Sequence, residues 1–360
     1  MMAQQSEFRP HDRGDDGGPD PRGARPRILV YDRLPPPPPP DDPAYAADRA
    51  RYYLLGLGHR GQAALRHFGV WDEVEAASVA VRGRRDWPPG KTAEEDGAMR
   101  LSDKAVTSRV LPRDKLVSVL KGVIEARYGD VVELRYGYQV DPVSFGNDPG
   151  GPDAAPGPPV ELLVSRCIPI ASSSSDDDGE ECSVDGDGAW PTTVTTDFLI
   201  GTDGAARTIA NAMEAGPRPQ KGAGRPFRVT RYRDDNPRVY KSVPLSFPSH
   251  WPRDLNYSAR SMGGRATLEA LPADAIGNYC ALLLLKPGDA LAAGNGDAAA
   301  LRIFFDSEFP QFSRLIGDDV LEDVARKGAS TLPGFRYAGP RLHEGGRTVL
   351  LGDCVHTVKP

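Results

Sequence analysis

Apolar and polar positions along the chain predict strands and helices in alternation. Short apolar runs rich in β-branched residues predict strands, and apolar spacing of i, i+3 and i+4 predicts helices. The predicted strands lie at 27–31, 51–57, 131–140, 197–202 and 348–353, and the predicted helices at 61–70 and 112–128. The strongest helix signal is 112–128, because Pro112 opens it and Leu116, Leu120 and Val123 share one face. This order predicts an α/β fold.

Two further regions have a different pattern. Residues 225–310 contain short apolar runs divided by Gly and Pro, which is typical of a sheet-rich region. Residues 1–26 are polar and rich in Gly and Pro, so they are predicted to be a disordered tail. Residues 144–193 form a low-complexity insert with one apolar segment, predicted as a strand of a hairpin.

Composition limits the class of protein. The 360 residues are 39% hydrophobic and carry a formal charge of −6, which gives no basic surface for a nucleic-acid partner. No apolar run approaches the roughly 20 residues that cross a bilayer, so no membrane segment is predicted. Cys167, Cys182, Cys280 and Cys354 lack C-x-x-C and zinc-ligand spacing. They favour free thiols in a reducing, intracellular compartment, with no metal site.

Two glycine motifs are candidates for ligand binding. Gly56–Gly61 has the G-x-G-x-x-G spacing of a dinucleotide loop, and an NAD-dependent dehydrogenase is one interpretation. The acidic residue expected about 20 positions later, at the end of the next strand, is missing. The second motif is Gly352-Asp353 at the end of an apolar run. Its carboxylate suits the hydroxyls of a sugar or the capping of a following helix.

The order of five segments resembles the FAD-dependent aromatic hydroxylases, or class A flavoprotein monooxygenases, with the strongest likeness to the kynurenine 3-monooxygenases. The segments are RILVYDR at 27–33, RYYLLGLGHRG at 51–61, LPRDKLVSVL at 111–120, DFLIGTDGA at 197–205 and LLGDCVHTVKP at 350–360. The resemblance implies a three-layer FAD/NAD(P)-binding fold without its first βαβ unit, and an inserted, mostly β substrate domain. The FAD-binding parts are then 27–143, 194–224 and 336–360, and the substrate domain is 225–335.

The resemblance also implies which residues form the site. Asp32 takes the place of the acid that binds the adenosine ribose of FAD. Arg84 aligns with an Arg that grips a substrate carboxylate, for which bidentate pairing is the physical reason. The remaining implied cofactor contacts are Arg33, Gly56, Arg113, Val140, Asp203, Gly204, Thr208, Gly352 and Asp353.

The implied activity is hydroxylation of a small aromatic substrate. FAD would accept hydride from NADPH and react with O2 to form a flavin hydroperoxide, so no catalytic side chain is predicted. Two parts of the family pattern are not found in the sequence. They are the opening strand–G-x-G-x-x-G–helix unit and the C-terminal segment that completes the substrate pocket. The sequence is therefore expected to be truncated at both ends. The alternative is therefore a noncatalytic fragment or interaction module that retains the scaffold.

Overall fold

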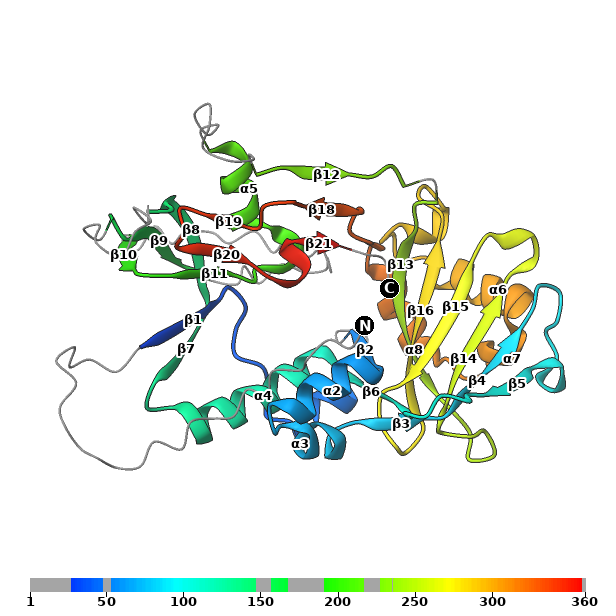
Figure 1. The fold of residues 1–360 in the computed structure, drawn as a ribbon. Helices are drawn as coiled ribbons and strands as arrows, with labels where there is room; N and C mark the ends of the chain where they lie inside the picture. Colours follow the sequence, from blue (N-terminus) through cyan, green and yellow to red (C-terminus); the bar gives the residue numbers. More distant parts are fainter. Residues whose placement is uncertain are drawn as a thin grey trace, which may run out of the picture.

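The computed structural model describes residues 27–47, 53–146, 157–167, 191–216, 227–234 and 236–357. These residues form a mixed α/β fold in which one large sheet with its helices stands beside several smaller sheets (Figure 1). The predicted fold class is confirmed. The predicted tail at 1–26 and most of the predicted insert at 144–193 lie outside the described residues.

The large sheet has seven strands. In spatial order they are β17 (Ser330–Thr331), β13 (Val239–Ser246), β16 (Asn278–Leu285), β15 (Thr267–Pro272), β14 (Leu255–Arg260), β4 (Gly83–Trp87) and β5 (Ala98–Leu101). Neighbouring strands are antiparallel, except that β4 runs parallel to β14. Strands β4 and β5 come from the segment 27–143, so that segment contributes to more than one sheet.

Three helices cover one face of the large sheet. They are α6 (Ala298–Glu308), α7 (Pro310–Ser313) and α8 (Asp318–Arg326). Along β14, Leu255, Tyr257 and Ala259 point toward these helices, as the period of two in a strand requires. They pack with Phe305 and Phe312 in the largest apolar cluster of the described chain. The residues that alternate with these three along β14 therefore lie on the opposite face of the sheet.

Lys241 on β13 is buried beside α8. Its Nζ donates hydrogen bonds to the carbonyl oxygens of Ala293 at 2.9 Å and Val324 at 3.1 Å. The side chain is only 4% exposed. Loss of hydration lowers the pKa of Lys241 from 10.5 to about 8. These hydrogen bonds connect the sheet to α8, and the ammonium group loses its hydration where it forms them.

This depressed pKa makes the stability of the fold depend on pH. Between about pH 8 and 10.5 the unfolded chain binds more protons at Lys241 than the folded chain, so stability rises with pH. We expect the unfolding free energy of the wild type to rise relative to Lys241→Met by up to about 3 kcal/mol over this range. Urea unfolding at several pH values measures it. The exposed Lys286→Met is the control, and parallel pH curves for the wild type and Lys241→Met would contradict the prediction.

A second group of elements packs helices around a small antiparallel sheet. It comprises β2 (Leu54–Leu57), β6 (Ser108–Pro112), β3 (Val79–Val81), α2 (His59–His67), α3 (Trp71–Ala76) and α4 (Arg113–Tyr128). The strongest predicted helix is confirmed, and α4 begins directly after Pro112. Val74, Leu111 and Val119 form the core of this group. Among the described helices, none is both long and apolar enough to span a bilayer.

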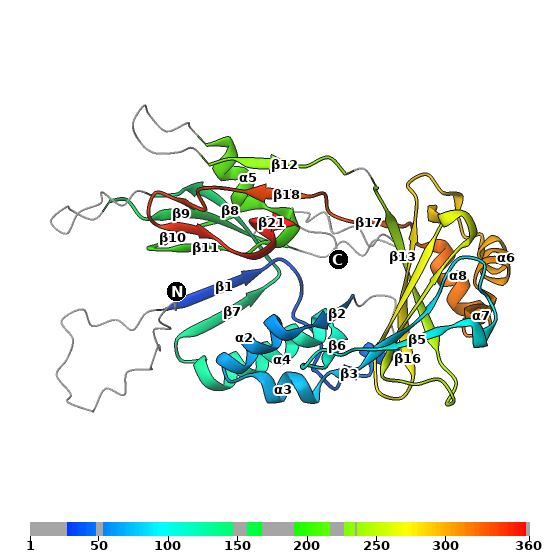
Figure 2. The ribbon, with the colours of Figure 1, turned by 45° about the vertical axis from the view of Figure 1, so that its right-hand side comes forward.

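The remaining elements include two pairs of parallel strands. One pair is β1 (Ile28–Asp32) with β7 (Val132–Tyr136), and the other is β11 (Leu199–Gly201) with β20 (Thr348–Leu350). Around them lie β8 (Tyr138–Ser144), β9 (Val160–Arg166), β10 (Thr192–Thr196), β12 (Val229–Arg231), β18 (Arg336–Ala338), β19 (His343–Glu344), β21 (His356–Thr357) and α5 (Thr208–Ala215). The short helix α1 (Ala44–Ala47) lies near α4, where Lys115 Nζ is 6.0 Å from the centroid of the Tyr45 ring. Figure 2 shows β1 and β7 beneath β11.

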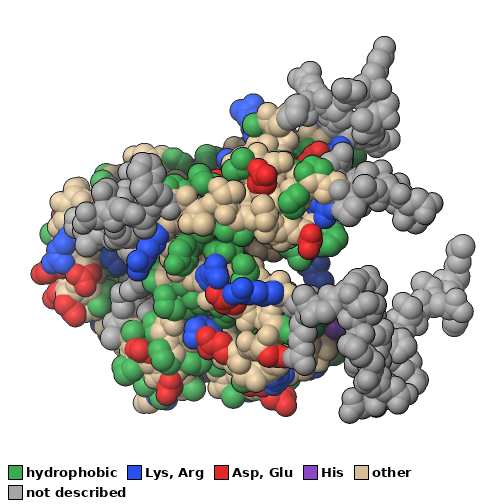
Figure 3. Space-filling model, turned by 90° about the vertical axis from the view of Figure 1, so that its left-hand side faces the viewer, with side chains coloured by type: hydrophobic (Ala, Val, Ile, Leu, Met, Phe, Trp, Pro, Cys, Tyr) green, Lys and Arg blue, Asp and Glu red, His purple; other side chains and the backbone are tan. Residues whose placement is uncertain are grey.

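Apolar side chains remain exposed on both parallel pairs. Ile28 and Val30 on β1 are 51% and 43% exposed, and Phe198 and Ile200 at β11 are 68% and 59% exposed. Figure 3 looks at this side of the molecule, where hydrophobic side chains alternate with small groups of both charge signs. On both pairs, apolar side chains that a parallel sheet normally buries are therefore exposed to solvent.

Predicted and observed strand bounds differ by a few residues, and two differences have a clear structural cause. The single strand predicted at 131–140 is two strands, β7 and β8, because Gly137 adopts a left-handed φ of 75° between them. The strand predicted at 348–353 ends at Leu350, since Gly352–Cys354 turn into a 3-10 helix, η5. The apolar segment of the predicted insert forms β9, which pairs with β8 and β10.

The cysteines depart from the predicted set of free thiols. Cys280 and Cys354 are free and buried. Cys167 is disulfide-bonded, so the prediction is wrong at this position. Missing C-x-x-C spacing excludes only a bridge between close neighbours in the sequence.

Candidate functional site

The β11–β20 pair brings two acidic glycine motifs together. Gly201 lies opposite Leu350 in the parallel register, and the Leu351 N–H donates to the Gly201 carbonyl oxygen at 2.9 Å. Asp203-Gly204 follows β11, and Gly352-Asp353 follows β20. Both motifs thus lie past the carboxyl ends of neighbouring parallel strands, where open α/β sheets bind ligands.

The glycines of these motifs leave room for a ligand. Gly204 has φ of 63° and Gly352 has φ of 73°, which favours glycine at both positions. Apart from each glycine and its chain neighbours, no atom of the described residues lies within 4 Å of the point where a Cβ would stand at either position. Backbone and space together allow a bound molecule to approach the main chain closely.

The Asp203 carboxylate has one oxygen in use and one unused. Its Oδ2 accepts a hydrogen bond from the Ile209 N–H at 2.9 Å in the first turn of α5, next to Thr208. Its Oδ1 is shielded from solvent and has no partner among the described residues. A buried acceptor without a partner is costly, so the site fits a ligand that donates a hydrogen bond.

Arg207 follows the Asp203-Gly204 motif and contacts the segment that follows Gly352-Asp353. The sequence patterns do not identify it as a site residue. It is 1% exposed, adopts a left-handed φ of 59°, and donates to the Val355 carbonyl oxygen at 3.5 Å. One of its terminal nitrogens is buried and has no hydrogen-bond partner in the part of the chain that the structure describes. Burial lowers the pKa of Arg207, with a further contribution from Arg336. The only signal that the sequence offers for this residue is its position four residues after Asp203. The sequence alone does not show that the Arg207 side chain is buried.

The Cys354 thiol makes structural contacts next to the glycine motifs. Its Sγ lies 3.0 Å from the Gly201 carbonyl oxygen and 2.9 Å from the Leu351 carbonyl oxygen, and its single S–H donates to one of them at a time. Burial, and then the nearby Asp203 charge, raise the pKa of the Cys354 thiol to about 11. The thiol is therefore protonated at neutral pH and is unsuited to act as a nucleophile.

The predicted contacts near the N-terminus fall in two other places. Asp32 and Arg33 lie at the carboxyl end of β1, where Asp32 accepts a hydrogen bond from the Leu34 N–H at 2.9 Å. Val140 is on β8, opposite Val164. Gly56 and Arg113 are brought together at the β2–β6 pair, where the Arg113 N–H donates to the Tyr53 carbonyl oxygen at 2.7 Å.

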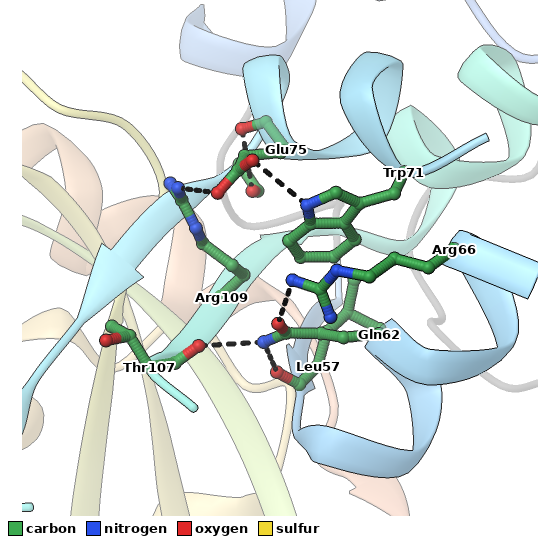
Figure 4. A network of polar contacts seen from close by, with 8 residues as sticks. Leu57, Gln62, Arg66, Trp71, Glu75, Thr107 and Arg109 are labelled. Atoms are coloured by element: carbon green, nitrogen blue, oxygen red, sulfur yellow. Dashed lines mark hydrogen bonds and ion pairs between the residues drawn. The ribbon is translucent and has the colours of Figure 1, made fainter. Parts of the chain in front are cut away.

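The Gly56–Gly61 segment does not form the dinucleotide loop of the dehydrogenase interpretation. Strand β2 is antiparallel to β6, whereas that loop requires a parallel βαβ unit. The buried Gln62 side chain donates from Nε2 to the carbonyl oxygens of Leu57 at 3.0 Å and Thr107 at 2.7 Å (Figure 4). The segment is thus built into local packing.

The same close-up shows how this region is held together. The Arg66 guanidinium lies over the Trp71 ring, 4.2 Å from its centroid, and donates to Gln62 Oε1 at 3.2 Å. Glu75 accepts from Trp71 Nε1 at 3.0 Å and pairs with Arg109. These contacts account for Arg66, Glu75 and Arg109 without a nucleotide.

Arg84 lies on β4 in the large sheet, apart from the glycine motifs. Its Nε pairs with Asp86 Oδ1 at 2.6 Å, and half of its side chain is exposed. The predicted site residues therefore form four groups: the two motifs, the end of β1 with nearby β8, the β2–β6 pair, and Arg84 on the large sheet.

Comparison with known proteins defines the class. Solved structures of similar fold include 2-methyl-3-hydroxypyridine-5-carboxylic acid oxygenase, p-nitrophenol 4-monooxygenase from Pseudomonas putida and a flavin-dependent halogenase, each with a TM-score of 0.53 and 14–15% identity. They cover 91%, 93% and 93% of this chain, and the matches span 69%, 68% and 50% of those chains. The chain has the fold of the FAD-dependent monooxygenases and halogenases.

Sequence relatives narrow the class. The chain is 24% identical over 339 residues to a kynurenine 3-monooxygenase of Salinispora arenicola, and 26% over 316 residues to one of Myxococcus xanthus. These matches cover 92% and 87% of this chain, but only 62% and 58% of the relatives' length. No protein-family model matches. The chain is similar in sequence to kynurenine 3-monooxygenases and in fold to FAD-dependent monooxygenases, which confirms the resemblance seen in its sequence.

Proposed function

We propose that this chain forms the FAD-binding part, and some of the substrate-binding part, of a monooxygenase that hydroxylates a small aromatic compound. The observation that carries the proposal is the pairing of Asp203-Gly204 with Gly352-Asp353 at the ends of two parallel strands. NADPH as reductant and O2 as co-substrate are part of the proposal. The names of the relatives and the likeness of the fold support it.

The described residues fit a flavin nucleotide in three respects. The glycines leave open space, Asp203 Oδ1 has no protein partner, and Asp353 is exposed beside them. In this proposal Asp353 accepts hydrogen bonds from hydroxyls on the flavin side, and Asp32 accepts those of the adenosine ribose. When bound, FAD would supply the redox chemistry that uses NADPH and O2, and the residues named here would hold its hydroxyl groups.

Flavin binding tests the proposal directly. We expect the 360-residue chain to quench FAD fluorescence on titration and to bind one FAD per chain. Asp353→Ala should weaken binding by about tenfold or more, because a charge-assisted hydrogen bond is lost. Asp103→Ala, which removes an exposed carboxylate elsewhere, is the matched control and should bind as the wild type does.

Two results count against this function. Failure of the wild type to bind FAD contradicts it and favours the noncatalytic scaffold as the alternative. Equal binding by the wild type and Asp353→Ala shows that FAD is held elsewhere than at the paired motifs.

A further inference from the structure

Arginines gather where α5 packs on the small sheet of β12, β18 and β21. Arg231 on β12 lies opposite Arg336 on β18, and Arg336 lies opposite Thr357 on β21. Residues directly opposite each other on adjacent strands point to the same face of a sheet. This face packs on α5, because Ala338, two residues after Arg336, shares an apolar cluster with Ile209 of α5. Figures 1 and 2 both show α5 beside β12.

Arg207 brings another guanidinium group to this face. It directly precedes α5, its side chain is 1% exposed, and it reaches the Val355 carbonyl oxygen just before β21. Burial is the main cause of its lowered pKa, and the positive charge of Arg336 is the next. The guanidinium groups of Arg207 and Arg336 therefore lie close enough to repel each other. With Arg231 they form a group of three, here called the arginine cluster.

Glu214 on α5 neutralises one member of the arginine cluster. Its two carboxylate oxygens pair with the two terminal nitrogens of Arg231, and the Nη1–Oε1 distance is 2.8 Å. The hydrogen bond from Arg231 is the main cause of the lowered pKa of Glu214. The charges of Arg207 and Arg336 lower it further, so this carboxylate lies near the whole cluster. Both of its oxygens are nevertheless engaged by Arg231.

Arg207 and Arg336 keep hydrogen-bond donors that no described residue uses. One terminal nitrogen of Arg207 is buried without a partner, and the guanidinium of Arg336 forms no hydrogen bond or ion pair within the described ranges. The charge of Asp203 has the smallest of the influences on the pKa of Arg207, and the two side chains form no ion pair in that part of the chain. A buried cation without a partner is costly, and a second cation beside it adds to the cost. An anion that accepts hydrogen bonds from both groups would remove this cost.

The surroundings favour a small oxyanion with more than one acceptor. A guanidinium donates two parallel hydrogen bonds to a phosphate, and the adjoining apolar cluster strengthens the attraction between opposite charges. The Thr357 hydroxyl is already engaged, since it accepts the Arg336 N–H at 3.2 Å and donates to the Gly334 carbonyl oxygen. Arg336 is partly exposed whereas Arg207 is buried, so an ion enters from the Arg336 side. A tetrahedral phosphate can turn separate oxygens toward the two arginines.

We propose that Arg336 and Arg207 form a binding site for a phosphate group, held between the partly exposed guanidinium and the buried one. Inorganic phosphate and a phosphate monoester share this chemistry, because both present a dianion with several free oxygens. The site does not rest on the proposed function, which assigns FAD to Asp32, Asp203 and Asp353. Arg336 lies on β18 and takes part in neither of the paired glycine motifs.

The test uses inorganic phosphate and ribose 5-phosphate as probes for the two sources of the group. Isothermal titration calorimetry at constant ionic strength measures their dissociation constants, with and without added FAD. The proteins are the wild type, Arg336→Gln, Glu214→Gln and Arg314→Gln, and circular dichroism shows that each is folded. Arg314→Gln is the matched control, because it removes the same charge from an exposed arginine directly after α7.

We expect the wild type and Arg314→Gln to bind inorganic phosphate with a dissociation constant of about 1 mM, the order for two charge-assisted hydrogen bonds. Arg336→Gln should bind at least about tenfold more weakly, because the exposed half of the site is lost. Glu214→Gln should bind about threefold more tightly, because the charge of Arg231 is then no longer neutralised. Ribose 5-phosphate should follow the same order, and the probe that binds more tightly identifies the source.

Equal affinity of the wild type and Arg336→Gln overturns the inference, and so does the absence of binding by both probes. Glu214→Gln decides the matter if Arg336→Gln does not fold, since phosphate binding no tighter than in the wild type contradicts the site. Displacement of phosphate by FAD also overturns it, because the phosphate then occupies the FAD site. If phosphate binds as expected but FAD does not bind, only the proposed function fails; if FAD binds but phosphate does not, only this site fails.

Discussion

Trp87→Ala is expected to lower the free energy of unfolding by about 3–5 kcal/mol, the range for deleting a large buried aromatic side chain. Trp87 is 1% exposed, and its ring stacks on Trp251 with centroids 5.7 Å apart and meets the edge of Phe312 at 5.4 Å. Its Nε1 also donates to the Ala93 carbonyl oxygen at 2.9 Å. Trp87→Ala leaves a cavity in the core and also removes this hydrogen bond, and both changes lower the free energy of unfolding.

Urea unfolding followed by tryptophan fluorescence and by circular dichroism measures this loss. Phe68→Ala is the matched control, because Phe68 is 70% exposed and its removal should change the unfolding free energy by less than about 0.5 kcal/mol. Trp87→Phe keeps an aromatic ring and should fall between the two. A loss below about 1 kcal/mol for Trp87→Ala would show that β4 is not part of the folded core.

Asp203→Asn is expected to weaken FAD binding about tenfold while leaving the fold as stable as the wild type. One carboxylate oxygen of Asp203 accepts a hydrogen bond from the Ile209 N–H, and the other has no partner within the described ranges of the chain. In Asn the amide oxygen can keep the contact to Ile209, and the NH2 group then replaces the unused acceptor with a donor. The structural contact is kept and the ligand contact is lost, at a cost of about 1.4 kcal/mol.

Asp203→Ala separates the two roles. It should also remove the contact to Ile209, which lowers the unfolding free energy by about 1 kcal/mol, as for the loss of a helix cap. FAD fluorescence quenching and thermal unfolding are measured on the same three proteins. Wild-type affinity in Asp203→Asn would rule out a ligand at the unused oxygen and leave Asp203 as a helix cap alone.

Local sequence signals were enough for the elements that depend on local contacts. Pro112 and the apolar face that follows it predicted α4 over almost its full length. The strand over 131–140 was predicted as continuous because Gly137 was not identified as a turn. A glycine within an alternating run is compatible with both a strand and a break, and only the left-handed φ decides.

Contacts between distant segments could not be predicted in this way. The parallel pairing of β4 with β14 joins residues 83–87 to residues 255–259, and neither segment marks the other as its partner. For the same reason Arg84 was predicted without Ser258 and Glu269, which the sheet register places near it. The pattern of the sequence predicts Gly352-Asp353 as a binding motif, and the resemblance adds Asp203-Gly204. Their proximity through β11 and β20 is a property of the fold.

The pairing of β11 with β20 also constrains when a ligand can be bound. Gly201 and the Asp203 motif leave the ribosome long before Leu350 and the Gly352-Asp353 motif are made. Until then β11 lacks its parallel partner, Cys354 cannot contact Gly201, and Arg207 lacks the Val355 carbonyl. A cofactor held by both motifs is therefore captured only after residues 348–357 have been synthesised, and a nascent chain that stalls before residue 350 would have no such site.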